Sequence, residues 1–427
     1  MTMTLLTVFI ISYFIHLSGR ISVLGNMRFD LLLGGLILVT IILKHTEDKW
    51  RTSIPTARKL NWFLLYIILS LPLVTWPGSV IHNNLVEWIK PALFFVFVIS
   101  IVRTEKQLKW IIVVFVACQV FRILEPLYLH ITTGYWGDIA YTHVGGTMTG
   151  LDRLSGAPFD VVNPNQLAWV IITTIPFFFY LFWGGSVWEK GIFIALIPPF
   201  IQCMLLTGSR SGLLSLGAVI VGIIYFSRQR MRNIVLALGL GLPVAIYVFA
   251  NMSSGFQTRY ESLVESDVAG ADTAQGRINA LKRQLSSVSH SPLFGNGLGT
   301  SGETNFNFTG GGSQITHDLY IEILQEAGIV GFTIFMVYVA SIIKSLREAK
   351  SLLEESGRDR QDWLYRLILA TQVWIFMDLF YSLSCFGLSS WEWYFFGGVA
   401  TVCLAIAREC RNATEHTPVN MAGVTHD

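Results

Sequence analysis

Long apolar runs recur along this sequence, and they constrain its fold more than any other feature. A run of about 17 to 25 apolar residues can cross the ~30 Å hydrocarbon core of a membrane as a helix, because a helix satisfies its own backbone hydrogen bonds. Such runs lie near residues 3–18, 29–44, 60–77, 85–102, 109–129, 166–183, 191–207, 212–227, 233–251, 317–343, 364–384 and 391–407. Only 14% of the residues are charged, against about 25% in an average soluble domain. The sequence therefore predicts an all-α polytopic membrane protein with about 12 transmembrane helices in one integral membrane domain, residues 1–427.

The distribution of Lys and Arg predicts the orientation, because basic residues are retained on the cytoplasmic side during insertion. With both termini inside, most basic residues fall in the inner connections, including a loop at 344–363 and a tail at 408–427. The long polar segments then face outward, as a first outer loop at 130–166 and a large loop at 252–316 between the ninth and tenth helices. No basic residue precedes Leu5, so we expect the first run to remain as a helix and not to act as a cleaved signal peptide.

Composition excludes several kinds of partner and site. The net charge is +2 and the sequence contains no basic stripe, so we expect no nucleic acid to bind. The five cysteines lie in or beside the apolar runs and not in the outer loops. Neither a disulfide framework nor a cysteine metal site is therefore indicated, and we expect chemistry without a metal or another cofactor.

The fifth apolar run contains two ionisable residues, Arg122 and Glu125, in its outer half. Charged groups inside a span are costly unless they pair or line a polar cavity. Their i, i+3 spacing allows a local ion pair near the outer interface, whereas a cavity that holds an anion would also account for Arg122. Both interpretations remain open from the sequence.

The first outer loop is rich in glycine and contains Arg153. An outward arginine beside glycines suits anion binding, because its planar fork of donors matches phosphate oxygens. The loop ends in Asn163-Pro164-Asn165, where an asparagine side chain is expected to cap the sixth helix.

The seventh and eighth runs meet at a tight corner, residues 206–212, which carries Arg210 between Ser209 and Ser211. Arg210 is expected to be surrounded by protein near the outer surface. There it either binds phosphate, with donors added by Ser211 and the amides at the start of the next helix, or ties two helix ends together.

The large outer loop contains a stretch, 276–285, in which Ile278, Leu281 and Leu285 form one stripe of a helix. This pattern predicts a short amphipathic helix on the membrane or over the bundle, with Arg277 at its start. The glycines at 295, 297 and 299 make a weak nucleotide-loop motif, because no Gly-Lys-Ser/Thr follows them.

The tenth run begins at His317 and carries polar residues at helical spacing, namely Asp318, Glu322, Gln325 and Glu326. A polar face on a helix that enters lipid must look into a polar cavity, unless this part of the helix lies outside the membrane. Two further acids in spans, Asp378 and Glu392, are expected to be structural hydrogen-bond partners.

Several of these pieces together resemble the O-antigen ligase and Wzy polymerase superfamily of bacterial envelope glycosyltransferases. They are the corner 206–212, the stretch from Gly276-Arg277 to Gly297, and His317-Asp318 followed by Gly328 and Gly331; the segment from Arg153 to Asn165 is also similar. Asp318 stands where the ligase pattern has Asn, Ser or Gln, which leaves both the ligase and the polymerase branch open.

The resemblance implies a GT-C-like inverting glycosyltransferase of the bacterial inner membrane, with its site on the periplasmic face. Its donor would be a glycan on undecaprenyl diphosphate, and its acceptor a sugar hydroxyl of lipid A-core for a ligase or of another lipid-linked glycan for a polymerase. Membrane lipids would surround it.

In such an enzyme His317 suits the general base, since its reference pKa is near 6.5. Arg210 and Arg277, followed by Arg153 and Arg122, suit the donor diphosphate. Asp318 or Glu322 could orient His317. A transporter of lipid-linked glycans is the alternative from another class, although the sequence lacks the repeated halves expected of one.

Overall fold

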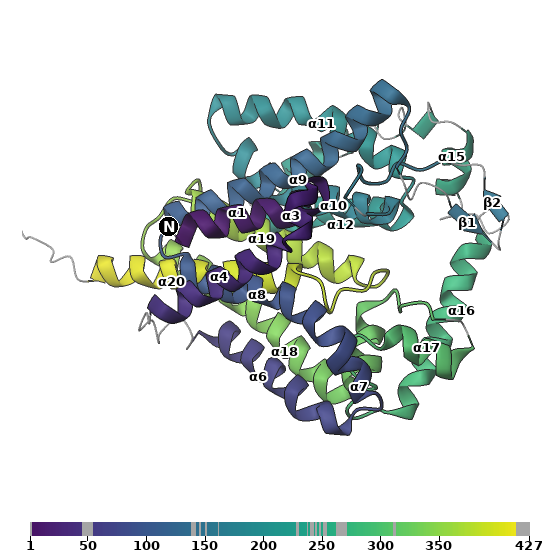
Figure 1. Ribbon diagram of the computed structural model, residues 1–427. Helices are drawn as coiled ribbons and strands as arrows, with labels where there is room; N and C mark the ends of the chain where they lie inside the picture. The colour runs from purple at the N-terminus through teal and green to yellow at the C-terminus, as the bar shows by residue number, and fades with distance from the viewer. Residues whose placement is uncertain are drawn as a thin grey trace, which may run out of the picture.

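The computed structural model describes residues 2–44, 54–137, 142–144, 147–149, 152–160, 162–227, 230–236, 238–239, 243, 246, 249–250, 254–261, 271–310 and 313–415. Helices make up almost all of the regular structure in this part of the chain (Figure 1). The first half contains α1 (Thr2–Ile15), α2 (Leu17–Arg20), α3 (Ser22–Asn26), α4 (Phe29–Lys44), α6 (Pro55–Ser70), η1 (Leu71–Leu73), α7 (Pro77–Ser79), η2 (Val80–Asn84), α8 (Leu85–Ile101), α9 (Glu105–Thr133), α10 (Pro164–Phe178), η3 (Phe179–Trp183) and α11 (Val187–Thr207). The second half contains α12 (Arg210–Phe226), α13 (Arg230–Leu236), α15 (Ser254–Glu261), α16 (Ala271–Ser287), η5 (Val288–His290), α17 (Ser301–Thr309), α18 (Leu319–Glu355), α19 (Trp363–Tyr381) and α20 (Glu392–Glu415).

Six helical stretches in the described part are long and apolar enough to cross a membrane by length and composition: Pro77–Ile101, Glu105–Thr133, Pro164–Trp183, Val187–Thr207, Leu319–Glu355 and Trp363–Tyr381. Shorter apolar helices are Thr2–Ile15, Phe29–Leu43 and Arg210–Phe226. The structure is consistent with the polytopic helical class expected from the sequence. Much of the ninth expected span, 233–251, lies outside the described residues.

The structure differs from the sequence expectation at two places. The first outer loop contains a short antiparallel hairpin, β1 (Thr142–Val144) paired with β2 (Thr147–Thr149), so the described chain is not purely α-helical. Helix α18 also continues to Glu355, so the inner connection expected at 344–363 begins as helix. The apolar pattern ends near residue 343, but a helix can continue as an amphipathic one when its buried face keeps a helical period; Leu346, Ala349 and Leu353 are buried.

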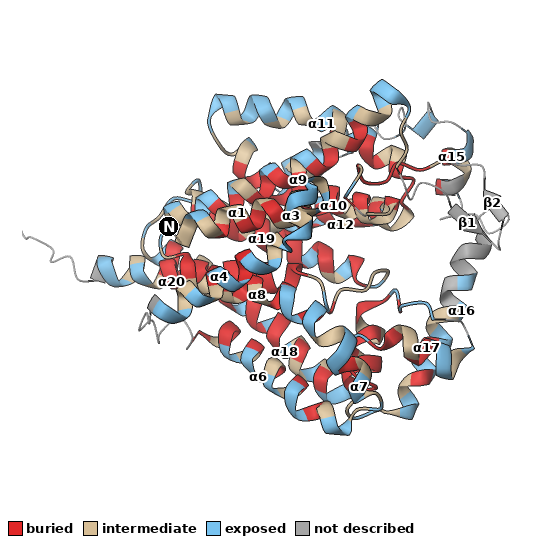
Figure 2. Ribbon diagram, viewed as in Figure 1, coloured by how far each residue is buried: buried red, intermediate tan, exposed pale blue. Residues whose placement is uncertain are grey.

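Helix α20 lies at the centre of the core and packs against α8 and α18. Its side chains are buried on all sides from Trp393 to Ala407, as expected of a helix that is apolar all round. Gly397 and Gly398 let its neighbours approach, since a Cβ at Gly398 would lie 3.0 Å from Val98. Figure 2 shows the buried residues concentrated where α8, α18, α19 and α20 meet, whereas much of α11 is exposed.

The two ends of the molecule differ in composition. The start of α1 and the end of α20 lie at one end, and α15, α16 and α17 lie at the opposite end (Figure 1). The connection from α19 to α20 lies between these outer helices and the bundle. The outer end therefore carries the polar segment 252–316 of the sequence.

A break in α18 fixes how the outer helices join the bundle. Gly328 has φ 65° and ψ −173°, which interrupts the helix and removes the hydrogen bonds that normally run across the turn. The segment Pro292–Gly297 replaces them: Asn296 N donates to Gln325 O (2.7 Å), Gly297 N to Glu326 O (2.9 Å), and Ile329 N to Pro292 O (2.9 Å). The glycine-rich stretch that weakly resembles a nucleotide loop therefore serves as a backbone clamp on the broken helix.

Candidate functional site

The start of α18 presents His317 at the outer end of the bundle. His317 is exposed, and its ring lies beside that of Phe386, with the ring centroids 5.6 Å apart. Asp318 follows as the N-cap of α18, and its carboxylate accepts a hydrogen bond from Ile321 N (2.9 Å). Burial raises the pKa of Asp318 above its ordinary value. The capping bond directs this carboxylate to the helix backbone.

Glu322, the other acid expected to support His317, binds a different element. Its Oε2 accepts hydrogen bonds from Gly387 N (2.8 Å) and Leu388 N (3.2 Å), and its side chain is buried. Glu322 therefore holds the connection between α19 and α20 against the first turn of α18. This connection also carries Phe386, whose ring lies beside that of His317.

The polar face of α18 continues with Gln325 and Glu326, and both bind the outer helices. The Gln325 amide donates to Ser287 Oγ (2.8 Å) in α16 and to Asn305 Oδ1 (3.0 Å) in α17. Glu326 accepts from Gly299 N (2.7 Å) and Ser301 N (3.2 Å) at the start of α17. The sequence places Gln325 and Glu326 where α18 is expected to enter lipid. In the structure, both side chains instead face other parts of the protein.

Arg277 lies in the first half of α16, and its side chain is outside the described part of the structure. Leu285 of the expected apolar stripe does not face the bundle, since it is 54% exposed, whereas Gln284 and Ser287 are buried. The described contacts of α16 with α18 include hydrogen bonds from Gln325 to Gln284 O and Ser287 Oγ. This docking places the helix that carries Arg277 beside the start of α18.

The corner between α11 and α12 is built for a sharp change of direction. Gly208 ends α11 in a left-handed conformation (φ 54°), and Ser209 caps α12 by accepting from Gly212 N (3.2 Å). Arg210 is the first residue of α12 and is half-buried; Ser211 follows, with its Oγ 3.3 Å from Ser209 Oγ. The corner therefore presents Arg210 and a hydroxyl at a helix N-terminus, where the helix dipole favours an anion.

Arg153 ties the first outer loop to this corner. Its Nε donates to Thr207 O (2.7 Å) and its Nη2 to Asn165 Oδ1 (2.7 Å). A cation at the last carbonyls of a helix is favoured by the helix dipole, so these bonds give the buried Arg153 a structural role that the sequence did not indicate. Asn163 caps α10 as expected, in a capping box with Gln166.

Arg122 and Glu125 do not form the local pair that their spacing allowed. Arg122 binds Asp160 through Nε (2.7 Å) and Nη2 (2.8 Å), whereas Glu125 accepts from Arg20 (2.6 Å). The tertiary structure supplies a better partner for each, because a carboxylate from another element can meet the guanidinium with both oxygens. Arg122 is buried with its charge balanced by Asp160.

Hydrogen bonds connect the Arg210 corner to the His317 end of α18. Arg153 joins Thr207 to Asn165, and the Asn165 carbonyl in turn accepts from Tyr381 Oη at the end of α19 (3.1 Å). The next residue, Ser382, accepts at its carbonyl from Leu319 N (2.9 Å). Two segments that are far apart in the sequence are therefore held in one arrangement.

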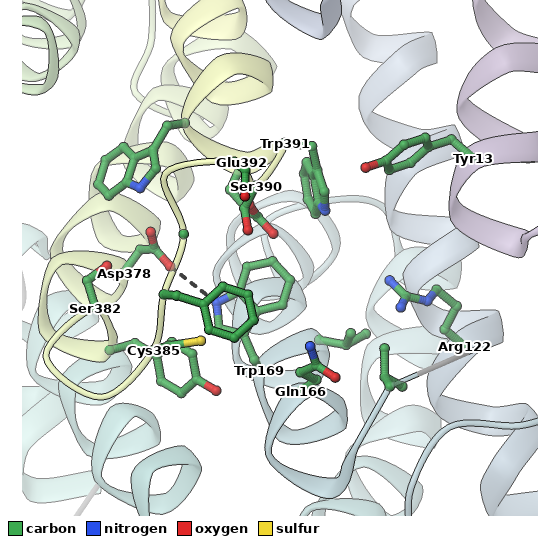
Figure 3. A pocket seen from close by; sticks show the side chains of 17 residues that line it. Tyr13, Arg122, Gln166, Trp169, Asp378, Ser382, Cys385, Ser390, Trp391 and Glu392 are labelled. Carbon is green, nitrogen blue, oxygen red and sulfur yellow. Dashed lines mark hydrogen bonds between the residues drawn. The ribbon is translucent and has the colours of Figure 1, made fainter. Parts of the chain in front are cut away.

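A cavity of about 240 Å³ lies beside this connection (Figure 3). Its lining comes from α1, α9, α10, the end of α19, the following connection and the start of α20. Tyr13, Arg122, Gln166, Trp169, Asp378, Ser382, Cys385, Ser390, Trp391 and Glu392 surround it. Phe386 also lines it, so His317 lies next to one wall of the cavity.

The cavity combines aromatic rings with carboxylates. Trp169 Nε1 donates to Asp378 Oδ1 (3.2 Å), and Glu392 points into the same space from the start of α20 (Figure 3). From the sequence, only structural roles are expected for Asp378 and Glu392, and neither Trp169 nor Trp391 stands out. Acidic residues inside apolar runs were the available signal, but nothing in the sequence showed that these two share a cavity.

Part of this site lies in a segment that matches a known family. Comparison with protein-family models finds a match to the O-antigen ligase family over residues 193–336. We call residues 193–336 the O-antigen ligase segment. The O-antigen ligase segment runs from α11 into α18 and contains Arg210, Arg277 and His317, which confirms the resemblance read from those residues. Arg122, Arg153, Asp378 and Glu392 lie outside the match.

No significantly similar chain was found among curated proteins. In the described part of the chain, no group of three or more His, Cys, Asp and Glu side chains is arranged to hold a metal ion.

Proposed function

We propose that this protein is an O-antigen ligase, which transfers a glycan from undecaprenyl diphosphate to a sugar hydroxyl of lipid A-core at the periplasmic face. The observation that carries the proposal is the O-antigen ligase segment, which contains Arg210, Arg277 and His317. The hydrogen-bonded connection between the corner and the start of α18 supports it, because a transferase must hold its donor site and its base in a fixed relation.

The donor leaves as a diphosphate, so the enzyme must stabilise growing negative charge. Fixed arginines in a protein pocket do this better than water, because their orientation is set before the reaction. Arg210 at the α12 N-terminus and Arg277 on α16 are the proposed diphosphate ligands. Arg153 and Arg122 are proposed to act mainly by holding the corner and the loop at 152–160, since both bind protein acceptors.

The acceptor hydroxyl must lose its proton as it attacks. In the proposed step, the acceptor oxygen forms a bond to the donor sugar C1, while the bond from C1 to the diphosphate oxygen breaks and its electron pair stays on the leaving diphosphate. The hydroxyl proton moves to the imidazole of His317. Because attack and departure occur on opposite faces of C1, the reaction inverts the anomeric configuration. Asp318 and Glu322 support this base indirectly, through the helix cap and through the connection that carries Phe386.

The cavity beside Phe386 is the proposed place for a sugar ring of the acceptor. At about 240 Å³ it is smaller than the ~300–1,000 Å³ pockets that hold drug-sized ligands, which suits a single ring. Trp169 and Trp391 offer flat faces for the C–H groups of a sugar. Asp378 and Glu392 offer acceptors for its hydroxyls.

The membrane placement belongs to the same proposal. About 12 spanning helices in a GT-C-like arrangement would put the basic connections in the cytoplasm of a bacterial inner-membrane protein and α16 and α17 in the periplasm. A cysteine placed at Arg283, which is exposed on α16, would be labelled by an impermeant thiol reagent added to intact spheroplasts. Labelling only after the membrane is permeabilised would show that α16 lies on the cytoplasmic side and would contradict the proposed orientation.

Reconstitution tests the reaction itself. Purified protein, a lipid-linked glycan donor and lipid A-core are combined in vesicles, and the expected product is glycosylated lipid A-core without added metal. A product made only with a second lipid-linked glycan would identify the polymerase branch. Movement of donor across the vesicle membrane without a new glycosidic bond would identify a transporter and overturn the proposal.

Two variant pairs test the assigned roles. His317→Ala is expected to lower the rate by about 10²- to 10⁴-fold, the usual contribution of a general base, whereas His82→Ala, an exposed histidine in η2, keeps full activity. Arg277→Lys is expected to lose about 10²-fold or more, against no loss for Arg283→Lys on the same helix. Full activity of His317→Ala would refute the mechanism.

A further inference from the structure

Two further cavities lie away from the transfer site, towards the end of the bundle where α1 starts and α20 ends. They adjoin one another between α12, α18 and α19, with volumes of about 440 and 300 Å³. Tyr225, Phe226, Arg347 and Gln372 line both cavities, so the two form one continuous groove. We call it the inner groove.

The mouth of the inner groove is basic. Arg230, Arg347 and Lys350 line the larger cavity, and Glu354 is its one acid among the lining residues. Glu354 is already paired, since it lies 2.9 Å from Arg360 Nη2 and accepts from Tyr365 Oη at 2.8 Å. The mouth therefore has an excess of positive charge.

Arg230 is exposed at this mouth and makes local contacts there. Its Nε donates to Tyr225 O (3.1 Å), and its guanidinium lies 5.3 Å from the centroid of the Tyr225 ring. An arginine fixed in this way keeps part of its planar fork for an anion. The mouth is thus both charged and partly ordered.

The other part of the groove is apolar and open at the surface of the bundle. Val221, Ile343, Ile375, Phe376 and Leu379 line it, and Val221 and Phe376 are 55% and 44% exposed. From Gln372 to Leu379 the groove follows α19 for roughly 10 Å at the rise of an α-helix. That length covers much of one leaflet, which is about half of the ~30 Å hydrocarbon core.

Gln372 lies where the basic and apolar parts meet. Its side chain is only 6% exposed, and no group in the described part of the chain lies within hydrogen-bond distance of its Oε1. A buried amide oxygen without a partner is costly. The groove therefore has an unused polar group between its basic mouth and its apolar wall.

We propose that the inner groove binds one anionic phospholipid, with its phosphate at Arg230, Arg347 and Lys350, its glycerol region at Gln372 and an acyl chain along the apolar wall. Basic pockets between transmembrane helices on the cytoplasmic side recognise acidic headgroups in this way. The site is independent of glycan transfer, and it requires only that this end of α12, α18 and α19 lies at a membrane surface. A free phosphate ion would use only the basic mouth and leave the apolar wall unexplained.

The test measures lipid retention by the full-length protein. Purified protein in a neutral detergent is titrated with phosphatidylglycerol or phosphatidylcholine, and bound lipid is counted by native mass spectrometry. We expect one phosphatidylglycerol to bind at least about tenfold more tightly than phosphatidylcholine. Arg347→Gln together with Lys350→Gln should weaken phosphatidylglycerol binding by roughly fivefold per charge removed, while Lys344→Gln, an exposed lysine on the same helix outside the groove, should leave it unchanged.

A second variant pair tests the apolar wall without changing charge. Val221→Trp should fill the groove and weaken binding by about tenfold or more, whereas Leu214→Trp, similarly exposed on α12 but outside the groove, should not. Equal affinity for the two phospholipids would overturn the proposal, as would unchanged binding in both groove variants. Displacement by millimolar inorganic phosphate would identify a simple anion site, and preference for a polyprenyl phosphate would identify a carrier-lipid site; either result would also overturn it.

Discussion

Replacing Gly328 with alanine tests whether the break in α18 is what holds the outer helices in place. Gly328 has φ 65° and ψ −173°, a backbone region that is open almost only to glycine. A Cβ there would lie 2.6 Å from Phe294 N and would also meet the carbonyl of Leu293. Ordinary contacts need about 3.5 Å, so the clamp segment would have to retreat by roughly 1 Å.

The magnitude follows from two contributions. Holding alanine in this conformation costs about 1–3 kcal/mol. The retreat breaks the bonds from Ile329 N to Pro292 O (2.9 Å) and from Val330 N to Leu293 O (3.3 Å), each worth about 1 kcal/mol. Together these predict a loss of about 3–5 kcal/mol in the free energy of unfolding, which corresponds to a fall of roughly 3–6 °C in Tm for a chain of this size.

Two other glycines provide graded controls for thermal unfolding of the purified protein. Gly310 has φ 64° with no atom within 4 Å of an added Cβ, and Gly217 has an ordinary helical conformation with no atom within 4 Å. Gly310→Ala should lower the free energy of unfolding only by the strain of the left-handed conformation, about 1–2 kcal/mol. Gly217→Ala should be neutral or slightly stabilising. If Gly328→Ala had the same Tm as Gly310→Ala, the clamp would contribute nothing to stability and the reasoning would fail.

Three further changes test other buried polar contacts. Asp160→Asn leaves Arg122 buried without its carboxylate and should cost about 3–5 kcal/mol, seen as a lower Tm that Arg122→Met in the same chain partly restores. Gln325→Leu removes the hydrogen bonds that join α16 and α17 to α18, so limited proteolysis should cut within α16 several-fold faster while the bundle stays intact; an unchanged cleavage rate would show that these bonds do not hold α16. Asp318→Asn keeps an N-cap but removes a carboxyl whose pKa is raised by burial. Its Tm should match or slightly exceed that of the unsubstituted protein at neutral pH, and the gap should close as the pH falls and Asp318 becomes protonated, whereas a gap that widened on acidification would contradict the raised pKa.

The helices of the bundle were largely predictable because an apolar run of sufficient length has few alternatives to a helix in a membrane. The same argument did not predict where α18 ends, because the helix continues to Glu355 after its apolar pattern stops. It also missed the β1–β2 hairpin, whose strands are only three residues long. Short strands leave too little alternation in the sequence to be read.

The arginines illustrate why residue type alone could not assign roles. Arg122, Arg153 and Arg210 all looked suited to phosphate, but Arg122 binds Asp160 and Arg153 binds Thr207 and Asn165. Their partners lie 38, 54 and 12 residues away, and no periodic pattern links such positions. The family match includes Arg210 and Arg277 and leaves Arg122 and Arg153 outside.

The sequence by itself determined the membrane class, the position of most helices and the residues that carry the family resemblance, because length, apolarity and short motifs are local properties. Only the tertiary structure decided what the polar face of α18 does. Asp318 caps the helix, Glu322 holds the connection beside His317, and Gln325 and Glu326 hold α16 and α17. The tertiary structure also brings Asp378 and Glu392 to the same cavity. These outcomes depend on which backbone amides reach each side chain across the fold, and that depends on helix packing and on the break at Gly328.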